Sequence, residues 1–91
     1  AVDNALEALA SRDLSRPFYL NIASQEPHAC LWNQVGTRIP AMPDSWTSWM
    51  PSGMPRTPAL ELAFRRFAAA VVHLDYGFGR LLDGLDSLGL R

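Results

Sequence analysis

The sequence contains no lysine, and its eight arginines, spread from Arg12 to Arg91, supply all of the strong positive charge. Nine acidic residues offset them, so the formal net charge at pH 7 is -1. Proteins that bind nucleic acid usually gather basic side chains into a patch that neutralises phosphates. No such cluster is present, and we expect no nucleic acid partner.

Cysteine and long apolar runs are also scarce. The single cysteine, Cys30, cannot form an internal disulfide, and no second Cys or His stands at a zinc-ligand spacing from it. The first residues lack the basic flank and apolar run of a signal peptide. Apolar residues reach 48% but are interrupted too often for a membrane span. We therefore expect a globular chain, or a piece of one, with no membrane span; its compartment stays open.

The N-terminal part of the chain predicts a short helix and then a strand. Ala5, Leu6 and Leu9 recur at helical spacing over about residues 3–11, with Asp3 or Asn4 as the expected cap. In residues 17–24, aromatic and branched side chains occur at both odd and even positions, which is typical of a strand buried on both faces, as in a parallel sheet.

The rest of the chain predicts a loop and a long helix. Residues 25–59 show no periodicity, hold six of the seven prolines and all three tryptophans, and predict a long loop. From about 60 to 88, apolar residues recur at steps of three and four, and Gly89 is the expected stop. Gly77, Gly79 and Gly84 inside this helix indicate close packing against a neighbouring element. The apolar positions are Phe64, Phe67, Val71, Leu74, Phe78, Leu81, Leu82, Leu85 and Leu88.

The predicted order of elements leaves one strand without a partner. A central parallel strand forms hydrogen bonds along both edges, so the missing strands have to come from elsewhere. The elements therefore predict a fragment of an α/β protein, with a short helix, a buried strand, a long loop rich in proline and tryptophan, and a long helix.

Three stretches carry a resemblance to a known family. The first reads RPFYLNIAS at 16–24 and is followed by EPH at 26–28. The second reads MPSGMPRTP at 50–58. The third reads FAAAVVHLD at 67–75 and continues with GRLLD at 79–83 and LDSLGL at 85–90. In this order they resemble the middle of the sulfatase catalytic domain, in the alkaline-phosphatase-like superfamily. The proline-rich stretch is similar to that of the sulfamidase and heparan-type branch.

This resemblance implies that residues 1–91 form part of a sulfatase catalytic domain with an α/β sandwich fold. It implies a parent enzyme that hydrolyses sulfate esters, using a formylglycine nucleophile and a calcium ion whose ligands lie outside this segment. The nucleophile motif is Cys or Ser, any residue, Pro or Ala, any residue, then Arg. The run from Cys30 to Gln34 fails at both fixed positions, so the isolated chain is expected to be inactive and to bind no metal or cofactor.

His28 is the expected functional residue, because it follows the predicted strand where ligands bind in open α/β sheets. Its imidazole suits contact with a substrate sulfate or protonation of the leaving oxygen. Glu26 is expected in a supporting role. The alternative for His28 is a loop histidine that bonds local backbone. The tryptophans and methionines of the loop could line a sugar or aryl pocket, although such side chains more often anchor a loop to its domain. Arg38 and Arg56 could bind an anionic substrate bidentately, although an ordinary structural role is favoured for them.

Two other functions stay open at this point. A phosphoesterase or phosphotransferase of the same superfamily would differ mainly in the nucleophile and the metals, which lie outside the segment. A non-enzymatic interaction module would use the apolar stripe of the long helix to pack a partner helix, and the Trp- and Pro-rich loop to hold a peptide.

Overall fold

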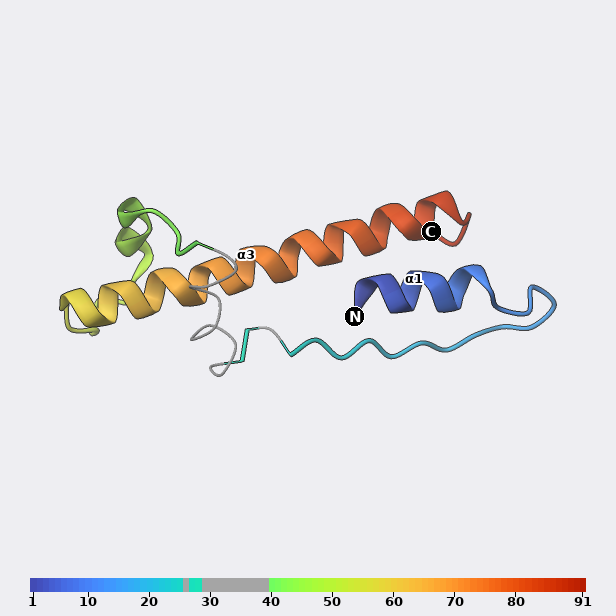
Figure 1. Cartoon of the computed structure of the whole chain (residues 1–91), viewed down its shortest axis with the longest axis horizontal. Coiled ribbons are helices and arrows are strands. Elements are labelled where there is room, and N and C mark those ends of the chain that lie inside the picture. The colour runs from blue at the N-terminus through green and yellow to red at the C-terminus, as the bar shows by residue number, and fades with distance from the viewer. Residues whose placement is uncertain (26, 29–39) are drawn as a thin grey trace. The chain divides into compact units, whose positions relative to one another are not determined.

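The computed structural model describes residues 1–25, 27–28 and 40–91. Its elements are α1 (Val2–Ala10), the 3-10 helix η1 (Asp44–Trp49) and α3 (Pro58–Ser87), seen in blue, green and yellow to red in Figure 1. The chain divides into two compact units, one of residues 1–24 with 75–91 and one of residues 25–74. Helix α3 contributes to both units.

Helix α1 stands where the sequence predicts a helix over about 3–11, but its cap differs from the expectation. Ala1 precedes the helix without a side-chain cap, and Asp3 lies in the first turn, where a negative charge favours the helix dipole. At the other end, the Ser11 hydroxyl donates to the Glu7 carbonyl at 3.0 Å, and the Arg12 guanidinium donates to the Leu9 carbonyl at 2.8 Å. The same two carbonyls also accept the backbone N–H groups of Ser11, at 3.1 Å, and Arg12, at 3.5 Å, so side chains reinforce the bonds that end the helix.

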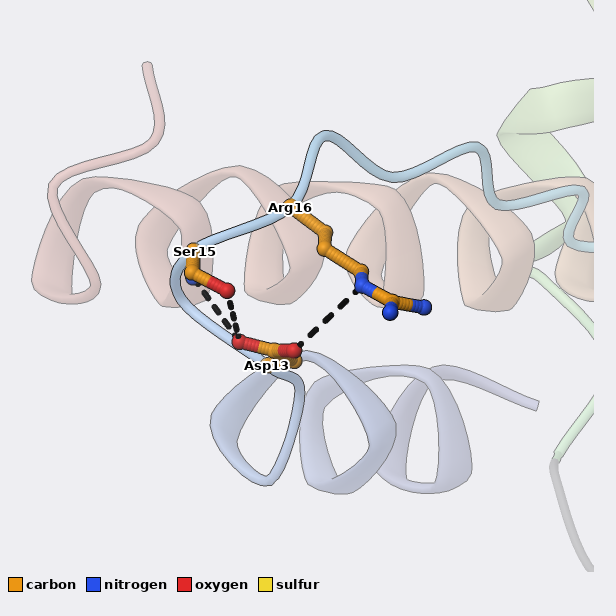
Figure 2. Close-up of polar contacts among 3 residues, drawn as sticks. All are labelled: Asp13, Ser15 and Arg16. Atoms are coloured by element: carbon orange, nitrogen blue, oxygen red, sulfur yellow. Dashed lines mark hydrogen bonds and ion pairs between the residues drawn. The ribbon is translucent and has the colours of Figure 1, made fainter.

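The turn after α1 is ordered by Asp13 (Figure 2). One oxygen of its carboxylate accepts hydrogen bonds from the Ser15 backbone N–H at 2.9 Å and from the Ser15 hydroxyl at 2.6 Å. The other oxygen lies 3.6 Å from Nε of Arg16. An aspartate that bonds the backbone two residues on is a common way to reverse the chain, and here it leads into residues 17–24.

Helix α3 begins with a side-chain cap and a proline. The Thr57 Oγ1 accepts a hydrogen bond from the Leu60 N–H at 3.2 Å. Pro58 takes the first helical position, where its fixed φ suits the helix and its missing N–H costs nothing. The start of the long helix is thus determined by local sequence.

Helix α3 ends at the glycine that the sequence predicts as its stop. Gly89 has φ +70°, a conformation that residues with a Cβ rarely adopt. The Leu90 N–H donates to the Leu85 carbonyl at 2.8 Å, and the Gly89 N–H donates to the Asp86 carbonyl at 3.0 Å. This pair of bonds is the Schellman motif, which satisfies the last carbonyls of a helix.

In the first unit, α1 packs on the C-terminal turns of α3. Asp3 Oδ1 lies 2.5 Å from Nη2 of Arg80, and Leu6 lies against Gly84. Because later residues of α1 meet later residues of α3, the two helices run in the same direction. Ala5 and Leu9 are the buried side chains of α1.

In the second unit, a small core forms between α3 and the segment that contains η1. Ala69 and Ala70 are 1% and 0% exposed, and Met42 packs against them. Met50, directly after η1, is 8% exposed. Most of the buried side chains in this unit are small, so polar contacts carry much of the attachment of η1 to α3.

The described residues contain no β-strand, so the predicted strand at 17–24 and the α/β sandwich fragment are both wrong for this chain. A strand exists only through hydrogen bonds to a neighbouring strand. Residues 18–23 make no backbone hydrogen bond to any described residue, and Tyr19 is 92% exposed. Apolar residues at both odd and even positions indicated a buried strand, but such a pattern carries no information on whether a second strand is present to pair with it.

Candidate functional site

His28 lies in the second unit, shortly after the segment of residues 17–24. Its side chain is exposed. Its backbone N–H donates to the Gln25 carbonyl at 2.8 Å, so a tight turn sets its position. An exposed imidazole in such a turn can offer a hydrogen bond or a proton to a ligand oxygen.

The other residues expected near this site are not all in view. Glu26, expected to support His28, lies outside the described residues, as do Cys30, Trp32 and Arg38. No group of three or more His, Cys, Asp or Glu side chains is gathered within the part of the chain that the structure describes. Of the two residues expected at this site, His28 and Glu26, His28 is the one that lies among the described residues.

The best-held feature of the second unit is η1, which interrupts the predicted loop of residues 25–59. Arg65 of α3 holds it, with Nε donating to the Met42 carbonyl at 2.6 Å and Nη1 lying 2.9 Å from Asp44 Oδ1. The Met42 N–H donates back to the Arg65 carbonyl at 3.1 Å. One arginine thus ties the segment that precedes η1 to α3.

The C-terminal end of η1 is held by Arg56. The Thr47 carbonyl accepts hydrogen bonds from the Met50 N–H, at 3.1 Å, and from Nη1 of Arg56. A cation at the carbonyl end of a helical turn is electrostatically favourable. Trp49, the last residue of η1, remains 76% exposed.

Sequence reasoning missed the role of Arg65 and the existence of η1. Tryptophan and proline content suggested only a loop, and Arg65 occupies a position beside the apolar stripe where a solvated arginine is the ordinary expectation. The bond from Arg65 to Met42 spans 23 residues, and no local pattern encodes such a contact. Anchoring the loop was the commoner role expected of its tryptophans and methionines, and of the neighbouring pair Met50 is buried while Trp49 is exposed.

The first unit contains an open hollow between α1 and residues 20–23. Its lining is mostly apolar, and none of the sequence-predicted site residues contributes to it. It holds no constellation for acid–base or nucleophilic chemistry.

The described helices include none that is long and apolar enough to cross a bilayer. In comparisons with protein-family models, with curated proteins and with solved structures, nothing matches this chain. Any functional conclusion therefore rests on the residues and their geometry, together with the sequence resemblance.

Proposed function

We propose that this chain is a segment of a sulfuric ester hydrolase of the sulfatase family, in which His28 contacts the sulfate of the substrate. The observation that carries the proposal is the resemblance itself: an apolar run closed by Glu26-Pro27-His28, followed by the Leu-Asp, Gly-Arg and Gly-Leu pairs of a long helix. The exposed position of His28 supports it, because a ligand can reach the imidazole.

In this role His28 acts on the sulfate ester in one of two ways. A protonated imidazole donates a hydrogen bond to a non-bridging sulfate oxygen, or it transfers its proton to the leaving oxygen as the sulfur–oxygen bond breaks. The nucleophile and the calcium ligands are supplied by other parts of the parent enzyme, so the 91 residues alone are expected to show no turnover.

The test is made on the parent protein encoded by the surrounding open reading frame. That frame should encode Cys or Ser, any residue, Pro or Ala, any residue, then Arg upstream of this segment. We expect His28→Ala to lower kcat/KM for an aryl sulfate by about 100-fold or more, as loss of an acid catalyst does. His73→Ala is the matched control, since His73 is also exposed but lies on α3.

Two results would count against this function. One is an open reading frame that lacks the nucleophile motif, and the other is full activity in His28→Ala. Preference for aryl phosphate over aryl sulfate in the parent enzyme would instead favour the related phosphoesterase.

The interaction-module alternative has one observation in its favour. In α3 the apolar stripe is not fully covered, because Val71 and Phe78 are 39% and 57% exposed. A helix face of this kind suits packing against a partner helix. Sedimentation of the purified chain would distinguish the two: a monodisperse chain or a stoichiometric complex favours the module, and an aggregated chain disfavours it.

A further inference from the structure

We propose that Trp49 and Arg56 form a contact surface for the ring of a sulfate ester, with the indole stacking on the ring and the guanidinium bonding its anionic group. The inference rests on the proposed function and deepens it, because it supplies a contact for the part of the substrate that carries the sulfate. The ring is that of a sulfated sugar or of an aryl sulfate, and both offer a face and a negative charge.

The first step of the argument is that Trp49 belongs to η1, a helical turn that is bonded to α3. Arg65 holds the segment before η1 through the Met42 carbonyl at 2.6 Å and the Asp44 carboxylate at 2.9 Å. Met50, the residue after Trp49, is 8% exposed. The indole is thus 76% exposed on a turn whose two ends are tied down, which lowers the entropy cost of binding a ligand there.

The second step is that Trp49 is exposed and has no stacked cation among the described residues. Within the described part of the chain, the one cation stacked on a ring is Arg12, whose guanidinium carbon lies 5.4 Å from the Phe18 ring centroid. Among the described residues, no cation is stacked on Trp49. A single exposed apolar residue is ordinary on a protein surface, so exposure alone does not make a site.

The third step is an arginine bonded to the same end of η1. Arg56 donates one hydrogen bond to the Thr47 carbonyl, at the same end of η1 that carries Trp49. A guanidinium has five N–H donors, and Arg56 makes no other hydrogen bond or ion pair with a described residue. Its remaining donors suit a sulfate or carboxylate oxygen, which arginine can bind bidentately. The indole of Trp49 and the remaining N–H donors of Arg56, at one end of η1, suit a ligand ring that carries a negative charge.

The test is binding of small ligands to the full 91-residue chain, measured by calorimetry and by NMR shifts of the Trp49 indole N–H. The probes are phenyl sulfate, glucose 6-sulfate, inorganic sulfate and uncharged glucose. We expect the two sulfate esters to bind more tightly than either of the others. Trp49→Ala should weaken binding by about 2- to 12-fold, and Arg56→Gln by about 10-fold.

Two matched variants serve as controls. Trp46→Phe changes the other tryptophan of η1, and Arg16→Gln removes an exposed arginine elsewhere in the chain; both should leave binding unchanged. Far-UV circular dichroism checks that each variant keeps its helices. Unchanged affinity in both Trp49→Ala and Arg56→Gln overturns the inference, as does equally tight binding of inorganic sulfate.

Comparing phenyl sulfate with glucose 6-sulfate shows whether the ring that binds is an aryl group or a sugar. Comparing Trp49→Ala with His28→Ala tests this inference separately from the proposed function. Loss of phenyl sulfate binding alone in Trp49→Ala supports an aryl ester, and loss of glucose 6-sulfate binding supports a sugar. Loss in Trp49→Ala with full binding in His28→Ala supports this surface and counts against the histidine. Loss in His28→Ala with full binding in Trp49→Ala overturns this surface and leaves the proposed function standing.

Discussion

Gly84 of α3 lies directly beneath the side chain of Leu6 of α1. A Cβ at this position would stand 2.2 Å from Cδ2 and 3.0 Å from Cδ1 of Leu6, closer than packed atoms allow. Glycine at this position lowers the helix propensity of α3, but its missing Cβ leaves the space that the Leu6 side chain occupies. At Gly79, in the same helix, a Cβ would meet nothing within 4 Å.

These two glycines should respond oppositely to alanine. Gly79→Ala is expected to raise the free energy of unfolding by about 0.8–1 kcal/mol, through helix propensity alone. Gly84→Ala gains the same propensity but displaces Leu6, and overpacking typically costs about 1–3 kcal/mol. We expect it to be less stable than Gly79→Ala by at least about 1 kcal/mol, as measured by urea unfolding followed by circular dichroism.

A double variant isolates the cause. In a Leu6→Ala background the clash is gone, so Gly84→Ala should there become stabilising by about 0.8–1 kcal/mol. If Gly84→Ala has the same effect with Leu6 present and absent, the two residues do not pack as described.

The helices could be predicted because their signals are local. The apolar period and Gly89 at the end act within a few residues of one another, and the structure uses both. The helix begins at Pro58, two residues before the predicted start, because Thr57 caps it and Pro58 fits its first position. Close packing at the glycines was likewise expected, and Gly84 confirms it. Gly79 does not, because helix spacing alone does not tell which side of α3 meets α1.

The strand and η1 could not be obtained in the same way. A strand depends on a second segment, and residues 18–23 have no backbone partner among the described residues. The place of η1 depends on Arg65, which lies 23 residues from Met42 in sequence. Of the predicted site, His28 is exposed, and its role in substrate contact stays a prediction.

Replacing Arg65 by lysine should loosen the attachment of η1. Lysine cannot reproduce the fork that bonds the Met42 carbonyl and the Asp44 carboxylate together. Loss of the bond to the carbonyl should cost about 1 kcal/mol, and hydrogen exchange of the Met42 amide, which donates to the Arg65 carbonyl, should quicken about fivefold.

The matched variant is Asp44→Ala, which removes only the ion pair. The Asp44 side chain is 93% exposed, so solvent screens its attraction to Arg65, and the expected cost is below about 1 kcal/mol. Equal acceleration of Met42 exchange in both variants would show that the carboxylate, rather than the carbonyl, holds the segment.

The last prediction concerns acid sensitivity of the turn drawn in Figure 2. The hydrogen bond from the Ser15 hydroxyl, aided by the Ser15 backbone N–H, lowers the pKa of Asp13. Both bonds favour the carboxylate, so the folded pKa lies below the unfolded one. Their contribution to stability is therefore complete above the unfolded pKa, and it is lost as the pH falls through the folded pKa.

Ser15→Ala removes the larger of these two causes and should raise the pKa of Asp13, as read from an NMR titration of its carboxyl carbon. Its effect on the turn should be present at neutral pH and disappear in acid, where the wild-type carboxyl is also protonated. Ser48→Ala is the control, because the Ser48 hydroxyl donates to the Ser45 carbonyl and touches no carboxylate. An Asp13 pKa that is the same in wild type and Ser15→Ala would mean that the hydroxyl bond does not form in solution, which leaves the Ser15 backbone N–H and Arg16 as the contacts of the Asp13 carboxylate.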